Sequence, residues 1–137
     1  MEERFKVLVV DDEPDVLQSL SLLLSEDFDV TTAASPESAL ELNRTRRFDV
    51  ICSDYKMPRM MGTEFLRQVN TLPDAPSCVM LTGTPALVTP AERVGTDLVT
   101  VVGKPFEPAR LMRLIEQVAR LCQVRRTANE IQRRRGK

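Results

Sequence analysis

Five short apolar runs rich in β-branched residues, each followed by a longer segment, constrain the fold of this chain more than any other feature. The runs cover residues 5–10, 28–33, 48–53, 77–81 and 98–102. Each has the length of one buried strand, and the intervals between them leave room for helical crossovers. Strands that alternate with helices form a parallel sheet with helices on both faces. The pattern therefore predicts an α/β domain of five βα units.

Helical periodicity fills most of the intervals, and proline marks several helix starts. The interval after the fourth run differs, because Pro85 and Pro90 interrupt it and predict only a short or irregular helix near Ala91. The other predicted helices cover residues 14–25, 36–43, 63–70 and a longer stretch that begins at Pro108. The apolar residues predicted to face the core from this last helix are Leu111, Leu114, Ile115, Val118, Leu121 and Cys122.

The composition excludes several kinds of chemistry. None of the 137 residues is histidine, which removes histidine-based nucleophile activation, acid–base catalysis and imidazole metal sites. The three cysteines lie far apart without C-x-x-C spacing, which argues against a disulfide framework or a zinc site and indicates a reducing compartment. The apolar run at residues 7–10 is too short for a signal peptide or a membrane span. We therefore expect a cytoplasmic protein that does not enter a membrane.

The net charge of −1 hides an acidic body and a basic end. Residues 1–117 carry 19 acidic and 12 basic side chains, whereas residues 118–137 carry one acidic and seven basic side chains. Basic residues favour helix C-termini, so we interpret this end as a solvated helix and do not expect nucleic-acid binding from this chain alone. Its apolar residues, spaced three and four apart, fit either a linker helix or short coiled coil, or a frayed terminus. They are Leu121, Val124, Ala128 and Ile131.

Polar side chains stand directly after four of the five predicted strands. They are Asp11, Asp12 and Glu13 after the first strand, Asp54 after the third, Thr82 with Gly83 after the fourth, and Lys104 with Pro105 after the fifth. Ligand sites in open α/β sheets form beyond the carboxyl ends of the strands, so these residues are predicted to meet there. Converging carboxylates without imidazole or thiolate ligands favour Mg²⁺, or Mn²⁺. One of these aspartates could then act as a nucleophile toward a phosphoryl group.

The same residues, together with the loop Ser53-Asp54-Tyr55-Lys56-Met57-Pro58, resemble the receiver domain of two-component response regulators of the chemotaxis-regulator type. The resemblance covers about residues 5–122. It implies a flavodoxin-like doubly wound sheet with strand order 2-1-3-4-5. It also implies a receiver domain over residues 1–122, followed by a basic helical extension or linker at 123–137. Such a chain is either a single-domain regulator or the N-terminal part of a longer protein with an output domain.

The resemblance also implies a role for each site residue. Asp54 is the expected phosphoacceptor. Asp11, Asp12, Asp54 and the backbone carbonyl of Lys56 are the expected metal ligands, with Asp11 acting through water. Lys104 is expected to pair with the acyl phosphate, Thr82 to move toward it as the switch hydroxyl, and the Gly83 amide to contact it. The Lys104–Pro105 peptide corresponds to one that is cis in the family.

The resemblance further implies a signalling domain rather than an enzyme. The expected partners are a sensor histidine kinase or a phosphotransfer protein, and a second copy that would bind through the C-terminal helix or the face formed by the fourth and fifth strands. The main alternative is a magnesium-dependent phosphatase of the haloacid-dehalogenase type, although its D-x-D pattern is missing. Two departures from the receiver pattern are Val101, where an aromatic residue is common, and Met61, where Asp or Asn is common before the loop glycine.

Overall fold

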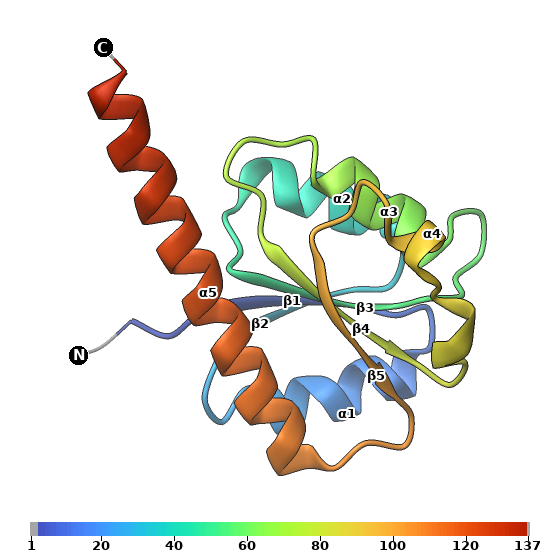
Figure 1. Cartoon of the computed structure of the whole chain (residues 1–137). Helices are drawn as coiled ribbons and strands as arrows, with labels where there is room; N and C mark the ends of the chain where they lie inside the picture. The colour runs from blue at the N-terminus through green and yellow to red at the C-terminus, as the bar shows by residue number, and fades with distance from the viewer. Residues whose placement is uncertain (1–2, 137) are drawn as a thin grey trace.

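The computed structural model describes residues 3–136, which form one five-stranded sheet covered by helices on both faces (Figure 1). The strands are β1 (Lys6–Val10), β2 (Asp29–Ala33), β3 (Val50–Asp54), β4 (Ser77–Thr82) and β5 (Leu98–Gly103). The helices are α1 (Pro14–Leu24), α2 (Pro36–Thr45), α3 (Gly62–Val69), α4 (Pro90–Arg93) and α5 (Pro108–Arg135), with a 3-10 turn η1 (Pro85–Leu87) before α4.

All four strand pairings are parallel, and the strand order is β2-β1-β3-β4-β5. This confirms the predicted α/β fold, its strand order and its five βα units. β1, β3 and β4 occupy the middle of the sheet and consist almost entirely of buried residues. Parallel sheets covered on both faces favour such continuous apolar strands, which explains why the runs were visible in the sequence.

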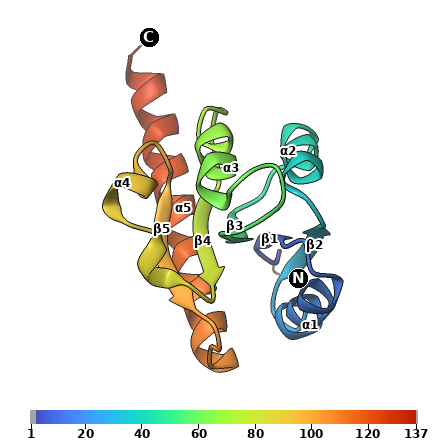
Figure 2. The same cartoon turned by 90° about the vertical axis from the view of Figure 1, so that its right-hand side faces the viewer.

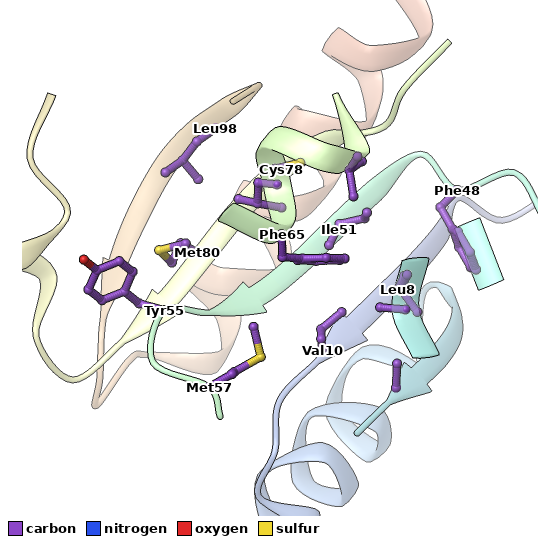
Figure 3. Close-up of a cluster of buried hydrophobic side chains, with 14 of the residues drawn as sticks. Leu8, Val10, Phe48, Ile51, Tyr55, Met57, Phe65, Cys78, Met80 and Leu98 are labelled. Atoms are coloured by element: carbon purple, nitrogen blue, oxygen red, sulfur yellow. The ribbon is translucent and has the colours of Figure 1, made fainter. Parts of the chain in front are cut away.

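Two apolar clusters fill the space between the sheet and its helices. On one face, Phe65, Leu66 and Val69 of α3 pack with Leu8 and Ile51 of the sheet (Figure 3). On the other face, α1 and α5 pack against the alternate strand residues, such as Val7 and Val9. Most of these core residues are aliphatic, and Phe48 and Phe65 are the largest fully buried side chains among them.

The segment between β4 and β5 contains only a 3-10 turn and one turn of α-helix, which confirms the short helix expected near Ala91. Pro85 and Pro90 each begin one of these two turns, because proline fits the first helical position and lacks an amide for any later one. The hydroxyl of Thr89 caps α4 by accepting a hydrogen bond from the Glu92 amide at 3.3 Å.

The last helix, α5, is 28 residues long and its C-terminal end projects beyond the sheet (Figures 1 and 2). The residues that it buries are Leu111, Ile115, Val118, Ala119, Cys122 and Arg126. The prediction for Leu121 was wrong, since 58% of this side chain is exposed. The helix presents Cys122 and Arg126 to the body instead, four residues apart, which turns Leu121 away.

Two arginines attach α5 to the end of the sheet at which the strands begin. Arg125 forms an ion pair with Asp97 and donates a hydrogen bond to the carbonyl of Ala75. Arg126 donates to the carbonyls of Phe48 and Asp74 at 2.6 and 2.8 Å. It also donates to a carboxylate oxygen of Asp49 at 3.1 Å. These bonds connect α5 with the segments that lead into β3, β4 and β5.

Candidate functional site

Three aspartates converge where β1 and β3 end. Val10, the last residue of β1, pairs with Ser53 of β3, so Asp11 lies just after β1 beside Asp54, the last residue of β3. Carboxylate oxygens of Asp11, Asp12 and Asp54 all lie within 4.8 Å of one another. Asp11 is only 2% exposed, whereas Asp12 lies at the surface and opens the cluster to solvent. The structure thus brings together the three carboxylates that the sequence singled out.

Lys104 supplies the positive charge at this cluster. Its Nζ lies 3.4 Å from Oδ2 of Asp11 and 3.8 Å from Oδ1 of Asp54. Its own backbone amide donates to the carbonyl of Thr82 at 2.8 Å, which continues the β4–β5 pairing up to the site. The side chain of Lys104 is partly exposed, so it borders both the carboxylates and the solvent. The adjoining Lys104–Pro105 peptide is cis, as the family resemblance implied.

Backbone amides hold two of the carboxylates in place. The amide of Glu13 donates to Oδ1 of Asp11 at 2.9 Å. The amide of Tyr55 donates to Oδ1 of Asp54 at 2.8 Å. Each carboxylate therefore accepts one fixed hydrogen bond and keeps other lone pairs for a cation or an incoming group.

The surroundings of Asp54 make its ionisation less favourable than that of a free aspartate. Burial raises the pKa of Asp54 above its ordinary value, and the charges of Asp11 and then Asp12 raise it further. Lys104 and the Tyr55 amide act in the opposite direction but do not cancel the increase. A divalent cation at the cluster would relieve this repulsion. The donor set fits that role, because Mg²⁺ and Mn²⁺ prefer carboxylate oxygens.

The hydroxyl predicted to act as a switch lies at the end of β4 and is engaged with its own loop. Oγ1 of Thr82 is 3.2 Å from Oγ1 of Thr84 and accepts the Thr84 amide at 3.1 Å. Gly83 lies between them and is exposed. Lys56 is also exposed, in the loop two residues after Asp54. The roles of the Lys56 carbonyl, the Gly83 amide and the Thr82 hydroxyl toward a ligand remain predictions.

Gly62, at the start of α3, allows the loop that follows Asp54 to close. Its amide donates to the carbonyl of Tyr55 at 2.6 Å. A β-carbon at this position would collide with the carbonyl oxygen of Asp54 and press on Cα of Tyr55. The loop glycine was noted in the sequence, but only the close approach of two backbone segments explains why it must be glycine.

Sequence reasoning missed a polar group behind the site that involves Tyr55, Thr63 and Glu92. The Thr63 hydroxyl donates to the Glu92 carboxylate at 2.9 Å, although these residues are far apart in the sequence. The charge of Glu92 also acts on the phenol of Tyr55, whose pKa is raised by burial and then by this charge. The only sequence signal is that Tyr55 adjoins Asp54. In β5, the position at which receiver domains often have an aromatic residue is occupied by Val101. This valine packs against the same apolar cluster as Tyr55.

A scan against protein families matches residues 7–116 to the response regulator receiver domain. Among curated proteins, the chain is similar to the cell cycle response regulator CtrA of Brucella ovis, with 28% identity over 116 residues. That match covers 84% of this chain and 50% of the relative, so the chain spans about half the length of that protein.

Solved structures give the same picture. The chemotaxis protein CheY4 of Vibrio cholerae is 33% identical with a TM-score of 0.78, and the match covers 84% of this chain and 98% of that one. A structure described as adenylate cyclase from Rhodopirellula baltica is 30% identical with a TM-score of 0.84, covering 95% of this chain and 98% of that one. Both sequence and fold therefore point to one family.

Proposed function

We propose, because the chain belongs to the response regulator receiver domain family, that Asp54 accepts a phosphoryl group from a phosphohistidine. The donor would be a sensor histidine kinase or a phosphotransfer protein of a two-component phosphorelay. The observation that carries the proposal is the convergence of Asp11, Asp12, Asp54 and Lys104 at one edge of the sheet. The missing histidine of this chain fits the same scheme, because the partner would contribute it.

The proposed step is a transfer from nitrogen to oxygen. A carboxylate oxygen of Asp54 attacks the phosphorus, the P–N bond to the donor imidazole breaks, and an acyl phosphate forms on Asp54. The departing imidazole keeps the electron pair of that bond and takes up a proton. Lys104, already 3.8 Å from Asp54, would stabilise the negative charge on the phosphoryl oxygens. The Thr82 hydroxyl would have to leave Thr84 before it could donate to the same oxygens.

Asp11, Asp12 and Asp54, with the carbonyl of Lys56, are the residues proposed to hold Mg²⁺, or Mn²⁺. When bound, the cation would neutralise charge on the phosphoryl oxygens during the transfer. The raised pKa of Asp54 supports this part of the proposal, because a cation would favour the ionised, nucleophilic carboxylate.

The family is a signalling family rather than one of conventional enzymes. The haloacid-dehalogenase alternative is not favoured, because the receiver family match covers most of the chain. We propose that phosphorylation changes the contacts of this domain with a partner. Among residues 3–136, no helix is long and apolar enough to cross a membrane. The free, buried cysteines support a reducing location such as the cytoplasm.

The test is intact-mass spectrometry after incubation with acetyl phosphate and Mg²⁺. We expect the protein to gain the mass of one phosphoryl group, and the gain to vanish when Mg²⁺ is chelated. Asp54→Ala should abolish it, whereas Asp27→Ala, a change of an exposed aspartate in the α1–β2 turn, should leave it unchanged. An unmodified wild type, or equal modification of the Asp54→Ala variant, would overturn the proposal.

We also propose that the basic extension expected at residues 123–137, of which Lys137 lies outside the described residues, pairs with a second copy of this chain through the end of α5. Leu121, Val124, Ala128 and Ile131 are all exposed and repeat at coiled-coil spacing, on the side of α5 that faces away from the body. Two arginines beside this stripe, Arg120 and Arg134, are already paired with glutamates of their own helix. Two copies would therefore bring together few uncompensated charges.

Analytical ultracentrifugation tests the pairing with matched variants. We expect concentration-dependent dimers, lost in Val124→Asp but retained in Leu22→Asp, which changes an equally exposed apolar residue on α1. Val99→Asp addresses the alternative interface on the β4–β5 face, where Val99 is exposed. Monomers at all concentrations, with and without acetyl phosphate, would contradict the pairing. Dimers sensitive only to Val99→Asp would move it to the β4–β5 face.

A further inference from the structure

The C-terminal part of α5 borders an open cleft at the end of the sheet where the strands begin, on the side of the helix that faces the body (Figure 1). Residues 3–6, Arg47 and the α5 residues Gln123, Thr127 and Glu130 line it, so distant parts of the chain meet there. The cleft has a volume of about 880 Å³, within the range of about 300–1,000 Å³ typical of small-molecule sites. It lies at the opposite end of the sheet from the aspartate cluster and is a separate feature.

The helix presents a polar side to this cleft. Its lining residues recur at spacings of three and four, as on one side of an α-helix, and are Gln123, Arg126, Thr127, Glu130, Arg133 and Arg134. The apolar residues proposed above to contact a second copy, such as Val124, do not line the cleft. The two sides of α5 could therefore be occupied at the same time.

The charges that line the cleft do not balance. Six lining residues are basic and four are acidic, which leaves a net charge of +2. Three of the acidic residues are each paired with an arginine of α5, and these pairs are Asp49–Arg126, Asp74–Arg133 and Glu130–Arg134. Those carboxylates are thus already compensated.

The three remaining cations of the cleft have no carboxylate partner among residues 3–136. Arg4 donates a hydrogen bond to the carbonyl of Ser25 at 2.8 Å, whereas Lys6 and Arg47 belong to none of the ion pairs. All three residues are exposed, so a ligand in the cleft could reach them. Glu3, also exposed, is the acidic lining residue that stands against them.

A second hollow extends the basic surface. It has a volume of about 320 Å³ and shares Arg47, Asp74 and Arg126 with the cleft, and it adds Arg44 and Arg46. Like charges are crowded here: burial lowers the pKa of Arg126, and the charge of Arg47 acts in the same direction. A bound anion would relieve this repulsion.

We propose that the cleft binds a small polyphosphate, either inorganic or attached to a nucleoside. Guanidinium groups donate paired hydrogen bonds to phosphate oxygens, and most cations of the cleft are arginines. A ligand with three or more negative charges matches Arg4, Lys6 and Arg47, whereas a single exposed carboxylate would gain little there. The bound ligand would contact both the body and the end of α5. This proposal does not depend on the phosphorylation of Asp54.

Isothermal titration calorimetry of the full chain with sodium tripolyphosphate, at low ionic strength and with EDTA, tests the proposal. EDTA prevents divalent cations from bridging the ligand to the aspartate cluster. We expect one site whose affinity falls as salt is added. Lys6→Gln and Arg47→Gln should each weaken binding about tenfold, the low end for hydrogen bonds to a charged group. Arg113→Gln, which removes an exposed arginine of α5 outside the cleft, should leave binding unchanged.

Titrations with ATP and adenosine identify the source of the phosphate chain. Equal affinity for ATP and tripolyphosphate would mean that the phosphates alone are recognised, and tighter binding of ATP would identify a nucleotide as the ligand. Adenosine by itself should not bind. Amide NMR spectra locate the ligand independently, because the signals of Lys6 and Thr127 should shift on binding.

Three results would overturn the proposal. The first is the absence of binding by both methods, including the case in which a glutamate-rich peptide binds instead and indicates an acidic protein partner. The second is equal weakening by Arg113→Gln and Arg47→Gln, which would mean unspecific attraction to positive charge. The third is a set of NMR shifts confined to the surroundings of Lys104. Lys6 and Arg47 are exposed and lack ion pairs, so their glutamine variants should fold like the wild type, which circular dichroism checks.

Discussion

Replacing Arg126 by methionine should destabilise the protein strongly, because this arginine of α5 is buried with its partners. The guanidinium of Arg126 is buried, and the residue is only 6% exposed. It donates to the carbonyls of Phe48 and Asp74 and to the carboxylate of Asp49. Methionine retains most of the apolar stem, so the variant removes the charge and the donors while leaving a small cavity.

The expected loss follows from what remains after the substitution. The side chain of Asp49 is 17% exposed and would lose its counter-ion, keeping only the hydrogen bond from the Lys6 amide at 2.8 Å. Breaking such a buried pair from one side costs about 3–5 kcal/mol. Two backbone carbonyls would lose a charged donor as well. We therefore expect the free energy of unfolding to fall by about 4 kcal/mol, or about 2 M in the urea midpoint.

Urea denaturation followed by circular dichroism measures this loss, with two comparison variants. Arg126→Lys keeps the charge but cannot donate to all three groups, so it should lie between the wild type and Arg126→Met. Arg133→Met removes an arginine that is 59% exposed and 3.5 Å from Asp74, and it should cost under about 1 kcal/mol. An Arg126→Met variant as stable as the wild type, or Arg133→Met equally damaging, would refute the reasoning.

Three further predictions concern the site and the core. Gly62→Ala should lower the free energy of unfolding by about 2–3 kcal/mol and slow phosphorylation, because its β-carbon meets the Asp54 carbonyl; Gly83→Ala, with open space around it, should change urea stability little. Without divalent cations, Asp54→Asn should raise the melting temperature at neutral pH. Because the pKa of Asp54 is raised in the folded protein, the wild type loses stability as the pH rises from 3.8 through the pKa of the folded state. The higher melting temperature of the variant should therefore disappear below pH 3.8. A difference in melting temperature that does not change with pH would contradict this prediction. In the native protein the thiols should resist a disulfide reagent at mildly alkaline pH, because burial raises the pKa of Cys52 to about 12 and raises that of Cys78 also; labelling before unfolding would refute this.

The fold and most of the site were predictable because both depend on local patterns read in chain order. A buried parallel strand is a continuous apolar run, and a crossover helix has its own period, so the five units could be counted directly. In a parallel sheet, the carboxyl ends of all strands lie at the same end of the sheet. Asp11, Asp54 and Lys104 could therefore be assigned to one site without knowing any distance between them. In the structure, Nζ of Lys104 lies 3.4 Å from a carboxylate oxygen of Asp11 and 3.8 Å from one of Asp54.

The side chains that escaped prediction are those whose role depends on a distant partner. Arg126 stands among the arginines of a basic helix end and resembles any solvated cation, yet it is buried because Asp49 and two carbonyls from other segments surround it. Leu121 fits the apolar period of α5 and is nevertheless exposed, because Cys122 and Arg126 take the side of the helix that faces the body.

Glu92 and Tyr55 belong to the same category. A glutamate in a proline-interrupted loop has no pattern that marks it, and the chain must fold before its carboxylate meets Thr63 and Tyr55. Periodicity and strand-end chemistry therefore determine the architecture and the position of the aspartate cluster in this chain. Contacts between charged and hydroxyl groups that are far apart in the sequence form only when the helices and strands pack. Local sequence patterns do not show which polar side chains will be buried next to one another.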